Sequence, residues 1–260
     1  TNGSILTDEM IDWLMFMDFQ VSISHDGPGQ SVRGPDPFDD PEVKERILGF
    51  YRMMTRLKKP FSFNAMLNQK NTSRKAIYDW FVNLTGDENV KLGEGSLVDA
   101  YDEDGVTNSL ITKEDHFKFR QQAFGEIISS NGRIGFDSVL LKAAGFGYDV
   151  LTHKEADYLG QKCGMDGENV IAVDLRGNVI TCQNVSAAET AMNGESHKIG
   201  SLDDYSNVKL NTSTHWSNRN NCSSCPVLHL CKGACMFLEG KYWETSCANS
   251  YSDNVALFSL

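Results

Sequence analysis

All seven cysteines of this chain lie after residue 162, and the long stretch before them contains none. They stand at Cys163, Cys182, Cys222, Cys225, Cys231, Cys235 and Cys247. Thiols crowded in this way are typical of a metal centre, because ligation of a common metal brings cysteines together. We therefore expect a cysteine-rich metal-binding part that follows a larger part of a different kind.

The charge and the apolar pattern of the chain exclude several classes of partner. The 260 residues carry a formal net charge of -11, whereas binding to nucleic acid or to an acidic membrane needs basic surface. No apolar run reaches the ~18–20 residues that span a bilayer, and the acidic N-terminal stretch lacks the basic segment of a signal peptide. We expect a cytoplasmic protein, in whose reducing surroundings clustered cysteines are metal ligands more often than disulfides.

Strand and helix patterns alternate along the cysteine-free part. Apolar periodicity and capping residues predict strands near 19–24, 61–67 and 95–101, and helices near 7–16, 40–54, 73–84 and 113–128. This order is typical of parallel βαβ units, although about three such units are too few for a complete eight-unit barrel. The Gly- and Pro-rich segment 25–41 is too long for a plain turn and has the character of a ligand loop.

The predicted secondary structure and the cysteine content change in the C-terminal part. Residues 131–160 give no clear pattern, and we expect them to bridge two domains, at 1–130 and 161–260. From 161 on, short strands and turns predominate, including a predicted hairpin over 169–184 with Arg176, Gly177 and Asn178 at its turn. The sequence thus predicts an α/β domain followed by a small cysteine-rich α+β domain.

The cysteine spacing allows two kinds of metal site. Cys222 and Cys225 form a CxxC pair, which serves both zinc and iron–sulfur sites. One zinc ion would use four cysteines and leave three without a role. Two iron–sulfur clusters would need eight ligands, so seven fits one closed cluster and one with a non-cysteine or open position. Spacing alone leaves zinc and iron–sulfur open.

The complete cysteine pattern resembles that of the SPASM domain, the C-terminal extension of radical S-adenosylmethionine enzymes that modify peptides and proteins. The resemblance spans Cys163 to Cys247 and includes Gly177 and Gly233 at family positions. It implies two auxiliary [4Fe–4S] clusters. By this match the first cluster is held by Cys163, Cys182 and Cys235, and the second by Cys222, Cys225, Cys231 and Cys247.

Two positions depart from the sulfatase-maturating members of this family. Their eighth cysteine corresponds to Asp157 here, so the fourth ligand of the first cluster is Asp157, another oxygen ligand, or a position left open for substrate. They also carry Asp directly after the cysteine equivalent to Cys182, where this chain has Gln183. The resemblance therefore does not imply formylglycine formation.

The first domain resembles the later portion of the partial (β/α) TIM barrel of radical S-adenosylmethionine enzymes. "VSISHDGPGQSVRG" is similar to the fifth strand and its following loop, where the family has Ser-x-Asp-Gly and then Arg. The match implies that Ser24 binds the ribose or amino-acid part of the cofactor and that Arg33 pairs with its carboxylate. From the residues alone, Asp26-Gly27-Pro28 is equally a turn signal, and Arg33 can cap a loop carboxylate.

The family's CxxxCxxC motif, which holds the cluster that reduces S-adenosylmethionine, is absent from these 260 residues. The chain also begins without Met and stops in the apolar run "DNVALFSL", so we expect a fragment that is inactive alone. In the full protein the resemblance implies a third cluster, a 5′-deoxyadenosyl radical, a peptide or protein substrate and a reductant such as flavodoxin or ferredoxin. The alternatives are a non-catalytic iron–sulfur electron-transfer or scaffold module, and a zinc-binding interaction protein.

Overall fold

The computed structural model describes residues 1–96, 108, 113–153, 159–167, 169–190, 194–208 and 215–260. The chain divides into two compact units, the first formed by Thr1–Tyr148 with Ala256–Leu260 and the second by Asp149–Val255. The boundary falls inside 131–160, the segment expected to bridge two domains. That segment contains helix α6, Asp137–Leu151, which the sequence pattern did not predict.

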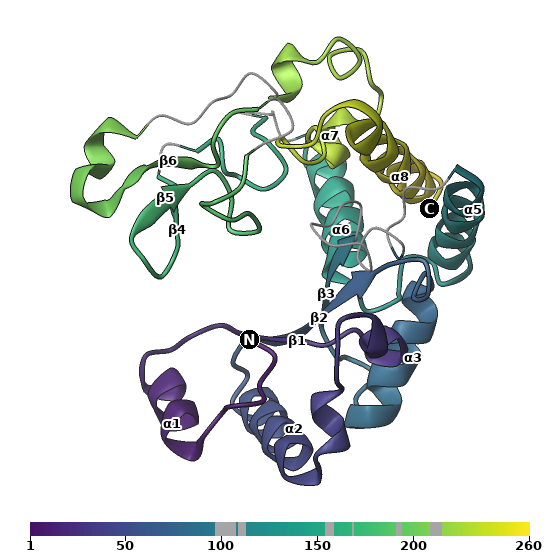
Figure 1. The fold of residues 1–260 in the computed structure, drawn as a ribbon. Helices are drawn as coiled ribbons and strands as arrows, with labels where there is room; N and C mark the ends of the chain where they lie inside the picture. Colours follow the sequence, from purple (N-terminus) through teal and green to yellow (C-terminus); the bar gives the residue numbers. More distant parts are fainter. Residues whose placement is uncertain (97–107, 109–112, 154–158, 168, 191–193, 209–214) are drawn as a thin grey trace. The chain divides into compact units, whose positions relative to one another are not determined.

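A parallel sheet organises the first unit (Figure 1). Its strands are β1 (Val21–Ser24), β2 (Phe61–Leu67) and β3 (Leu92–Ser96), in the order β1-β2-β3. Both pairings are parallel, with Val21 opposite Phe61 and Phe63 opposite Leu92. Further along the chain, Phe136 forms an isolated parallel bridge with Leu92 of β3. The α/β class with a parallel sheet is confirmed.

Helices follow the strands as the capping residues predict. They are α1 (Asp8–Phe16), α2 (Pro41–Arg56), α3 (Arg74–Thr85) and α5 (Lys113–Ser129). Thr7, Asp40 and Ser73 each accept a hydrogen bond from a backbone N–H of the first turn that follows, which satisfies donors that have no partner within the helix. Short 3-10 helices, Gly27–Val32 and Pro37–Asp39, shape the loop between β1 and α2.

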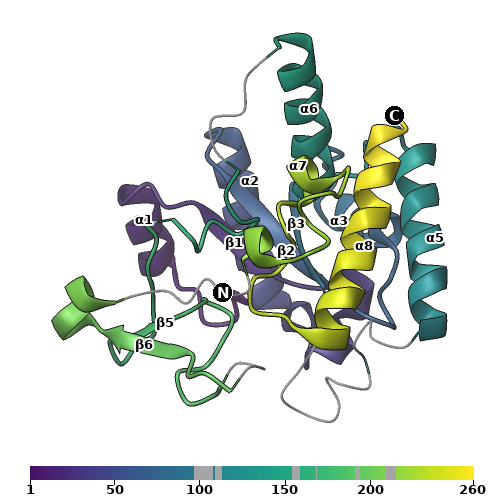
Figure 2. The ribbon, with the colours of Figure 1, turned by 90° about the horizontal axis from the view of Figure 1, so that it is seen from above.

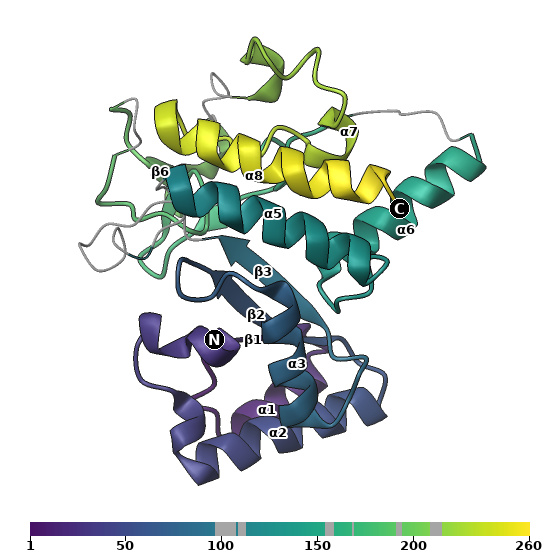
Figure 3. The same cartoon turned by 90° about the vertical axis from the view of Figure 1, so that its right-hand side faces the viewer.

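One face of the sheet forms the core of the first unit. Phe61 and Phe63 on β2 are buried; Tyr51 of α2 lies 5.4 Å from Phe61, and Phe81 of α3 lies 4.6 Å from Phe63, between ring centroids. Helices α2 and α3 therefore cover the same face, as Figure 1 shows. Helix α5 lies next to α3 (Figures 2 and 3), and the Ser73 hydroxyl donates to Glu126 Oε1 at 2.5 Å.

The opposite face of the sheet is made of small and polar residues. Successive strand residues alternate between the two faces, and the strand register places these residues beside one another: Ser22, Ser24, Ser62, Asn64, Met66, Gly93 and Gly95. Asn64 lies over Gly93, where an added Cβ would come within 1.8 Å of Asn64 Oδ1. This face lacks the bulky branched side chains that fill a closed barrel.

The second unit contains a small antiparallel sheet, β4 (Ala172–Val173), β5 (Asn178–Ile180) and β6 (Lys198–Ser201). The predicted hairpin is present, since β4 pairs with β5 and Gly177 at the turn has a φ of +79°. The other elements are the 3-10 helices Leu202–Asn207 and Trp216–Asn218 and the helices α7 (Leu228–Cys231) and α8 (Gly240–Phe258).

The third predicted strand differs from the observed one. Strand β3 begins at Leu92, three residues earlier than expected, and residues 97–101 of the expected strand lie outside the described residues. Of the helices that the structure describes, none is long and apolar enough to cross a membrane.

Candidate functional site

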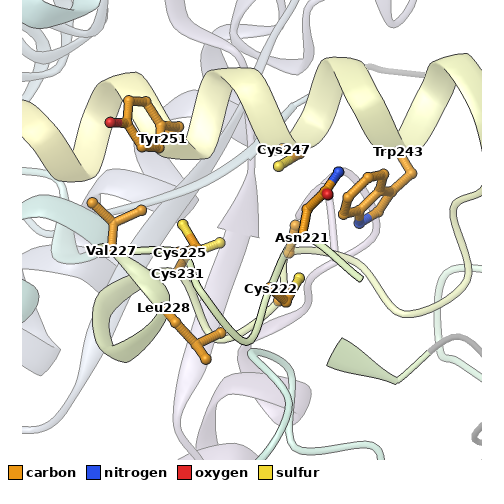
Figure 4. Close-up of a pocket in the computed structure, with 11 residues that line it drawn as sticks. Asn221, Cys222, Cys225, Val227, Leu228, Cys231, Trp243, Cys247 and Tyr251 are labelled. Carbon is orange, nitrogen blue, oxygen red and sulfur yellow. The ribbon is translucent and has the colours of Figure 1, made fainter. Parts of the chain in front are cut away.

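Four of the predicted metal ligands line one cavity of the second unit (Figure 4). Cys222, Cys225, Cys231 and Cys247 share this cavity with apolar residues such as Val227 and Leu228. The structure therefore brings together the four cysteines assigned by resemblance to the second cluster. Their role as ligands stays a prediction.

Local backbone structure places these four thiols. The Cys225 N–H donates to the Cys222 carbonyl at 3.1 Å, so the CxxC pair sits on one tight turn, and the Cys231 N–H donates to the Val227 carbonyl at 2.8 Å within α7. Cys247 lies on α8 four residues after Trp243, and this spacing puts both side chains on the same face of the helix. Two short turns and one long helix thus enclose the cavity.

The thiols of this set interact electrostatically. Burial raises the pKa of Cys247 to about 11, and the nearby Cys231, Cys222 and Cys225 thiolates contribute to this rise. Burial likewise raises the pKa of Cys222, with the thiolates nearby adding to the effect and the Arg219 guanidinium opposing it. In the metal-free protein Cys222 and Cys247 therefore hold their protons, and a bound cation would displace them.

The remaining three cysteines form a second neighbourhood. The Lys162 N–H donates to the Lys232 carbonyl at 2.9 Å, which ties the segment of Cys163 to the segment of Cys235. Desolvation around the thiol raises the pKa of Cys235, although the residue as a whole keeps contact with solvent, and the Cys182 and Cys163 thiolates raise it further. Burial also raises the pKa of Cys182, again with a contribution from Cys163. The fourth-ligand candidate Asp157 lies outside the described residues.

Neither set is arranged around a metal in this structure. In the described part of the chain, no three or more His, Cys, Asp or Glu side chains have the geometry of a metal site. Trp243, which lines the cavity, carries a buried indole nitrogen that has no hydrogen-bond partner in the part of the chain that the structure describes. A set of thiol ligands is the kind that holds zinc or iron–sulfur clusters. A hydrogen-bond donor beside this sulfur-rich site, the Trp243 indole, suits an iron–sulfur cluster. The residues present therefore fit a cluster in this cavity.

The loop after β1 is held together by an ion pair between a buried carboxylate, Asp26, and an exposed arginine, Arg33. Asp26 is 1% exposed and receives two hydrogen bonds from Arg33, Nη2 to Oδ1 at 2.5 Å and Nε to Oδ2 at 3.1 Å. Asp26 Oδ1 also accepts from the Met66 N–H of β2 at 2.7 Å. Arg33 thus caps a loop carboxylate, as the interpretation from the residues alone allowed. A cofactor role for Arg33 stays a prediction.

His25 fixes the same loop from inside. Its Nε2 lies 2.9 Å from Asp36 Oδ1, its Nδ1 accepts from the Gly27 N–H at 3.0 Å, and its ring stacks against both Phe38 and Trp80. Burial lowers the pKa of His25, and the hydrogen bond to Asp36 partly opposes this. The His25 side chain is fully buried. Its contacts are those of a residue that shapes the loop.

Ser24 lies at the carboxyl end of β1 on the polar face of the sheet. It is half-buried and stands opposite Asn64 in the strand register. In parallel α/β sheets, ligands bind at the carboxyl ends of the strands. This position is compatible with cofactor binding by Ser24, which stays a prediction.

Sequence reasoning missed one buried ion pair of the first unit. Arg74, the first residue of α3, is 2% exposed and donates to Glu94 of β3, Nε to Oε2 at 2.6 Å and Nη2 to Oε1 at 2.8 Å. A charged residue at the start of a helix normally faces solvent. The Gly-Glu-Gly run of β3 was the only signal that a carboxylate enters the sheet here.

Comparisons with known proteins show the fold. No family model matches the sequence, and no curated protein matches it. Among solved structures, a histidine-tagged form of anSMEcpe with bound AdoMet matches with a TM-score of 0.61 at 18% identity, covering 100% of this chain and 70% of that chain. Native anSMEcpe with bound AdoMet and Cp18Cys peptide matches with a TM-score of 0.61 at 19% identity, over 100% of this chain and 74% of that chain.

A third structure, native anSMEcpe with bound AdoMet and Kp18Cys peptide, has a TM-score of 0.57 at 17% identity, with coverage of 100% and 74%. The protein anSMEcpe is an anaerobic sulfatase-maturating enzyme of the radical S-adenosylmethionine/SPASM class. The expected resemblance to this class is thus confirmed at the level of the fold. Identities below a fifth carry no activity from one chain to the other.

Proposed function

We propose that this chain belongs to a radical S-adenosylmethionine enzyme that modifies a peptide or protein and carries two auxiliary [4Fe–4S] clusters. The observation that carries the proposal is the separation of the seven cysteines into a group of four around one cavity and a group of three around Cys235. The two groups are the two ligand sets of the resemblance, and they occur in a chain whose fold is similar to that of anSMEcpe.

The cysteine sets have separate roles in this proposal. Cys222, Cys225, Cys231 and Cys247 hold a closed cluster. Cys163, Cys182 and Cys235 hold a cluster whose fourth position is taken by Asp157, another oxygen ligand, or substrate. Raised thiol pKa values in the metal-free protein make loading of the clusters dependent on loss of protons.

The first unit binds the cofactor in this proposal. When bound, S-adenosylmethionine supplies a radical that abstracts hydrogen from the substrate. Ser24 and Arg33 orient the cofactor at the polar face of the sheet. A guanidinium carries five N–H donors, and the two bonds from Arg33 to Asp26 fix its plane while using two of them. Asp26 in turn is fixed by β2.

In this proposal the cluster that cleaves the cofactor, the reductant and the substrate are supplied from outside these 260 residues. The cluster that cleaves the cofactor needs the CxxxCxxC motif, and no cysteine precedes Cys163. The electron comes from a reductant such as flavodoxin or ferredoxin. A peptide substrate is supported by the neighbouring anSMEcpe structures, two of which hold peptides.

Metal analysis tests this function. The chain is reconstituted anaerobically with iron and sulfide, and iron, acid-labile sulfide and zinc per chain are measured together with the visible spectrum. Two [4Fe–4S] clusters predict about eight irons and eight sulfides in a brown protein. Stoichiometric zinc in a colourless protein would instead show a zinc-binding interaction protein. Iron-loaded protein from a gene without CxxxCxxC would show an electron-transfer or scaffold module.

A further inference from the structure

The indole N–H of Trp243 is a buried donor that finds no acceptor among the described residues, and the ring lines the cavity of the four cysteines. Trp216 in the same unit behaves differently, since its Nε1 donates to the Leu159 carbonyl at 3.0 Å. Buried tryptophan N–H groups normally find a partner, and leaving one unpaired is unfavourable.

The surroundings of Trp243 limit what that partner is. Figure 4 shows the indole on the side of the cavity where Cys222 and Cys247 lie, next to the Asn221 amide, with Val227 and Tyr251 on the opposite side. The Tyr251 hydroxyl is thus remote from the indole, the exposed Asn221 amide makes no bond to it, and the other lining residues besides the cysteines are apolar. Sulfur is therefore the acceptor that the cavity offers.

Arg219 stacks on this indole. Its guanidinium carbon lies 4.6 Å from the centroid of the Trp243 ring, and its Nη2 donates to the Leu238 carbonyl at 2.7 Å. The Cys222 N–H donates to the Arg219 carbonyl at 3.1 Å. A fixed positive charge thus lies over the ring and near Cys222 and Cys247, where it opposes the rise in the pKa of both thiols.

We propose that Trp243 donates its indole N–H to a sulfur of the cluster held by Cys222, Cys225, Cys231 and Cys247, and that Arg219 fixes the ring and adds positive charge. This inference rests on the proposed function. One-electron reduction makes a cluster more negative, and N–H···S hydrogen bonds and nearby positive charge stabilise that reduced state. Together the two residues raise the reduction potential of this cluster. The indole hydrogen bond acts on this cluster alone, whereas the charge of Arg219 also acts on Cys235 of the three-cysteine set.

A redox titration of reconstituted protein, followed by EPR with dithionite as electron donor, tests the inference. Trp243→Phe keeps an aromatic ring for Arg219 to stack on and removes only the N–H. We expect this variant to keep the wild-type iron content. At the wild-type midpoint potential, its ratio of reduced to oxidised cluster should be about tenfold lower. For a one-electron couple this corresponds to a midpoint potential lowered by about 59 mV. Arg219→Gln should lower the ratio too. Tyr242→Phe, the neighbour on α8, is the matched control and should leave it unchanged.

The outcomes separate the two proposals. Wild-type protein that takes up zinc and no iron overturns the proposed function and this inference with it. Iron-loaded Trp243→Phe with the wild-type midpoint overturns the inference alone. If Trp243→Phe does not fold, pulsed EPR on wild-type protein with ¹⁵N-indole-labelled tryptophan replaces it. Coupling of the reduced four-cysteine cluster to ¹⁵N is expected, and its absence contradicts the inference.

Discussion

Charged side chains in the interior of the first unit are the residues on which its stability depends most. Arg74 and Glu94 form a nearly dry pair, with side-chain exposures of 2% and 13%. Arg52 and Glu45 form a pair on the surface, with exposures of 56% and 71%. The two pairs have the same chemistry in opposite surroundings and therefore make a matched comparison.

We expect Arg74→Met to lower the free energy of unfolding by about 3–5 kcal/mol, because it removes the buried guanidinium that donates two hydrogen bonds to the Glu94 carboxylate. Arg52→Met should change it by less than about 1 kcal/mol, because an exposed ion pair is screened by water. Urea unfolding of both variants measures the difference. Equal effects from the two substitutions would show that the Arg74 pair is not desolvated in solution.

His25 gives a prediction on pH. Burial lowers its pKa below the ordinary value of 6.5, so the unfolded chain binds this proton more readily than the folded one. Its contribution to stability is complete above pH 6.5 and is lost as the pH falls towards the lowered pKa, at up to about 1.4 kcal/mol per pH unit. The stability difference between wild type and His25→Gln, from urea unfolding at several pH values, should shrink below pH 6.5. A difference independent of pH would contradict this.

For single residues, the sequence predicts which side chains lie together only where a spacing pattern determines it. The resemblance groups Cys222, Cys225, Cys231 and Cys247, and these four line one cavity, but their role as ligands stays a prediction. The same sequence did not reveal that Arg74 is buried or that the Trp243 indole has no acceptor among the described residues, because both depend on which element packs over them. The bidentate pair of Arg33 with Asp26 was one of two open interpretations, and only the folded loop shows it.

Among the elements, those with strong local signals were predicted closely. Strand β2 occupies the predicted 61–67, and helices α1, α2 and α3 begin directly after the capping residues Thr7, Asp40 and Ser73. Strand β3 was misplaced because its Leu-Gly-Glu-Gly-Ser sequence has low β-propensity. It is a strand because it pairs with β2, which is a tertiary effect.

Substitution of three glycines by alanine tests the backbone conformation of two turns and of one helix. Gly177 and Gly233 have φ values of +79° and +80°, which disfavour a side chain, and a Cβ at Gly233 would also lie 2.4 Å from Trp216 Cβ. We expect Gly177→Ala to destabilise by about 1 kcal/mol and Gly233→Ala by at least about 2 kcal/mol. Gly49→Ala, inside α2 with open space around it, should stabilise by up to about 1 kcal/mol.

Thermal or urea unfolding of the three variants gives the order of these effects. If Gly233→Ala is no worse than Gly177→Ala, the close approach of Trp216 to the turn between Cys231 and Cys235 is not present in solution. If Gly49→Ala destabilises, the helix at that position is not regular.

At the scale of the whole molecule, the candidate cofactor-binding residues and the candidate cluster ligands lie in different compact units. The first offers the polar face of a parallel sheet with Ser24 at the carboxyl end of a strand, and the second gathers all seven cysteines. The sequence anticipated an α/β part and a cysteine-rich part because periodicity and cysteine spacing are local. It did not anticipate α6 or the boundary at Tyr148, because compactness is a property of the folded chain.

The division of the cysteines into four and three is the central claim, and the iron content of two single variants tests it most directly. Cys247→Ala removes a ligand of the four-cysteine set, and Cys235→Ala removes a ligand of the three-cysteine set. After anaerobic reconstitution, each variant should hold about four irons where the wild type holds about eight, and a chain with both substitutions should hold almost none. Loss of all iron from either single variant, or full iron in Cys247→Ala, would contradict two independent clusters.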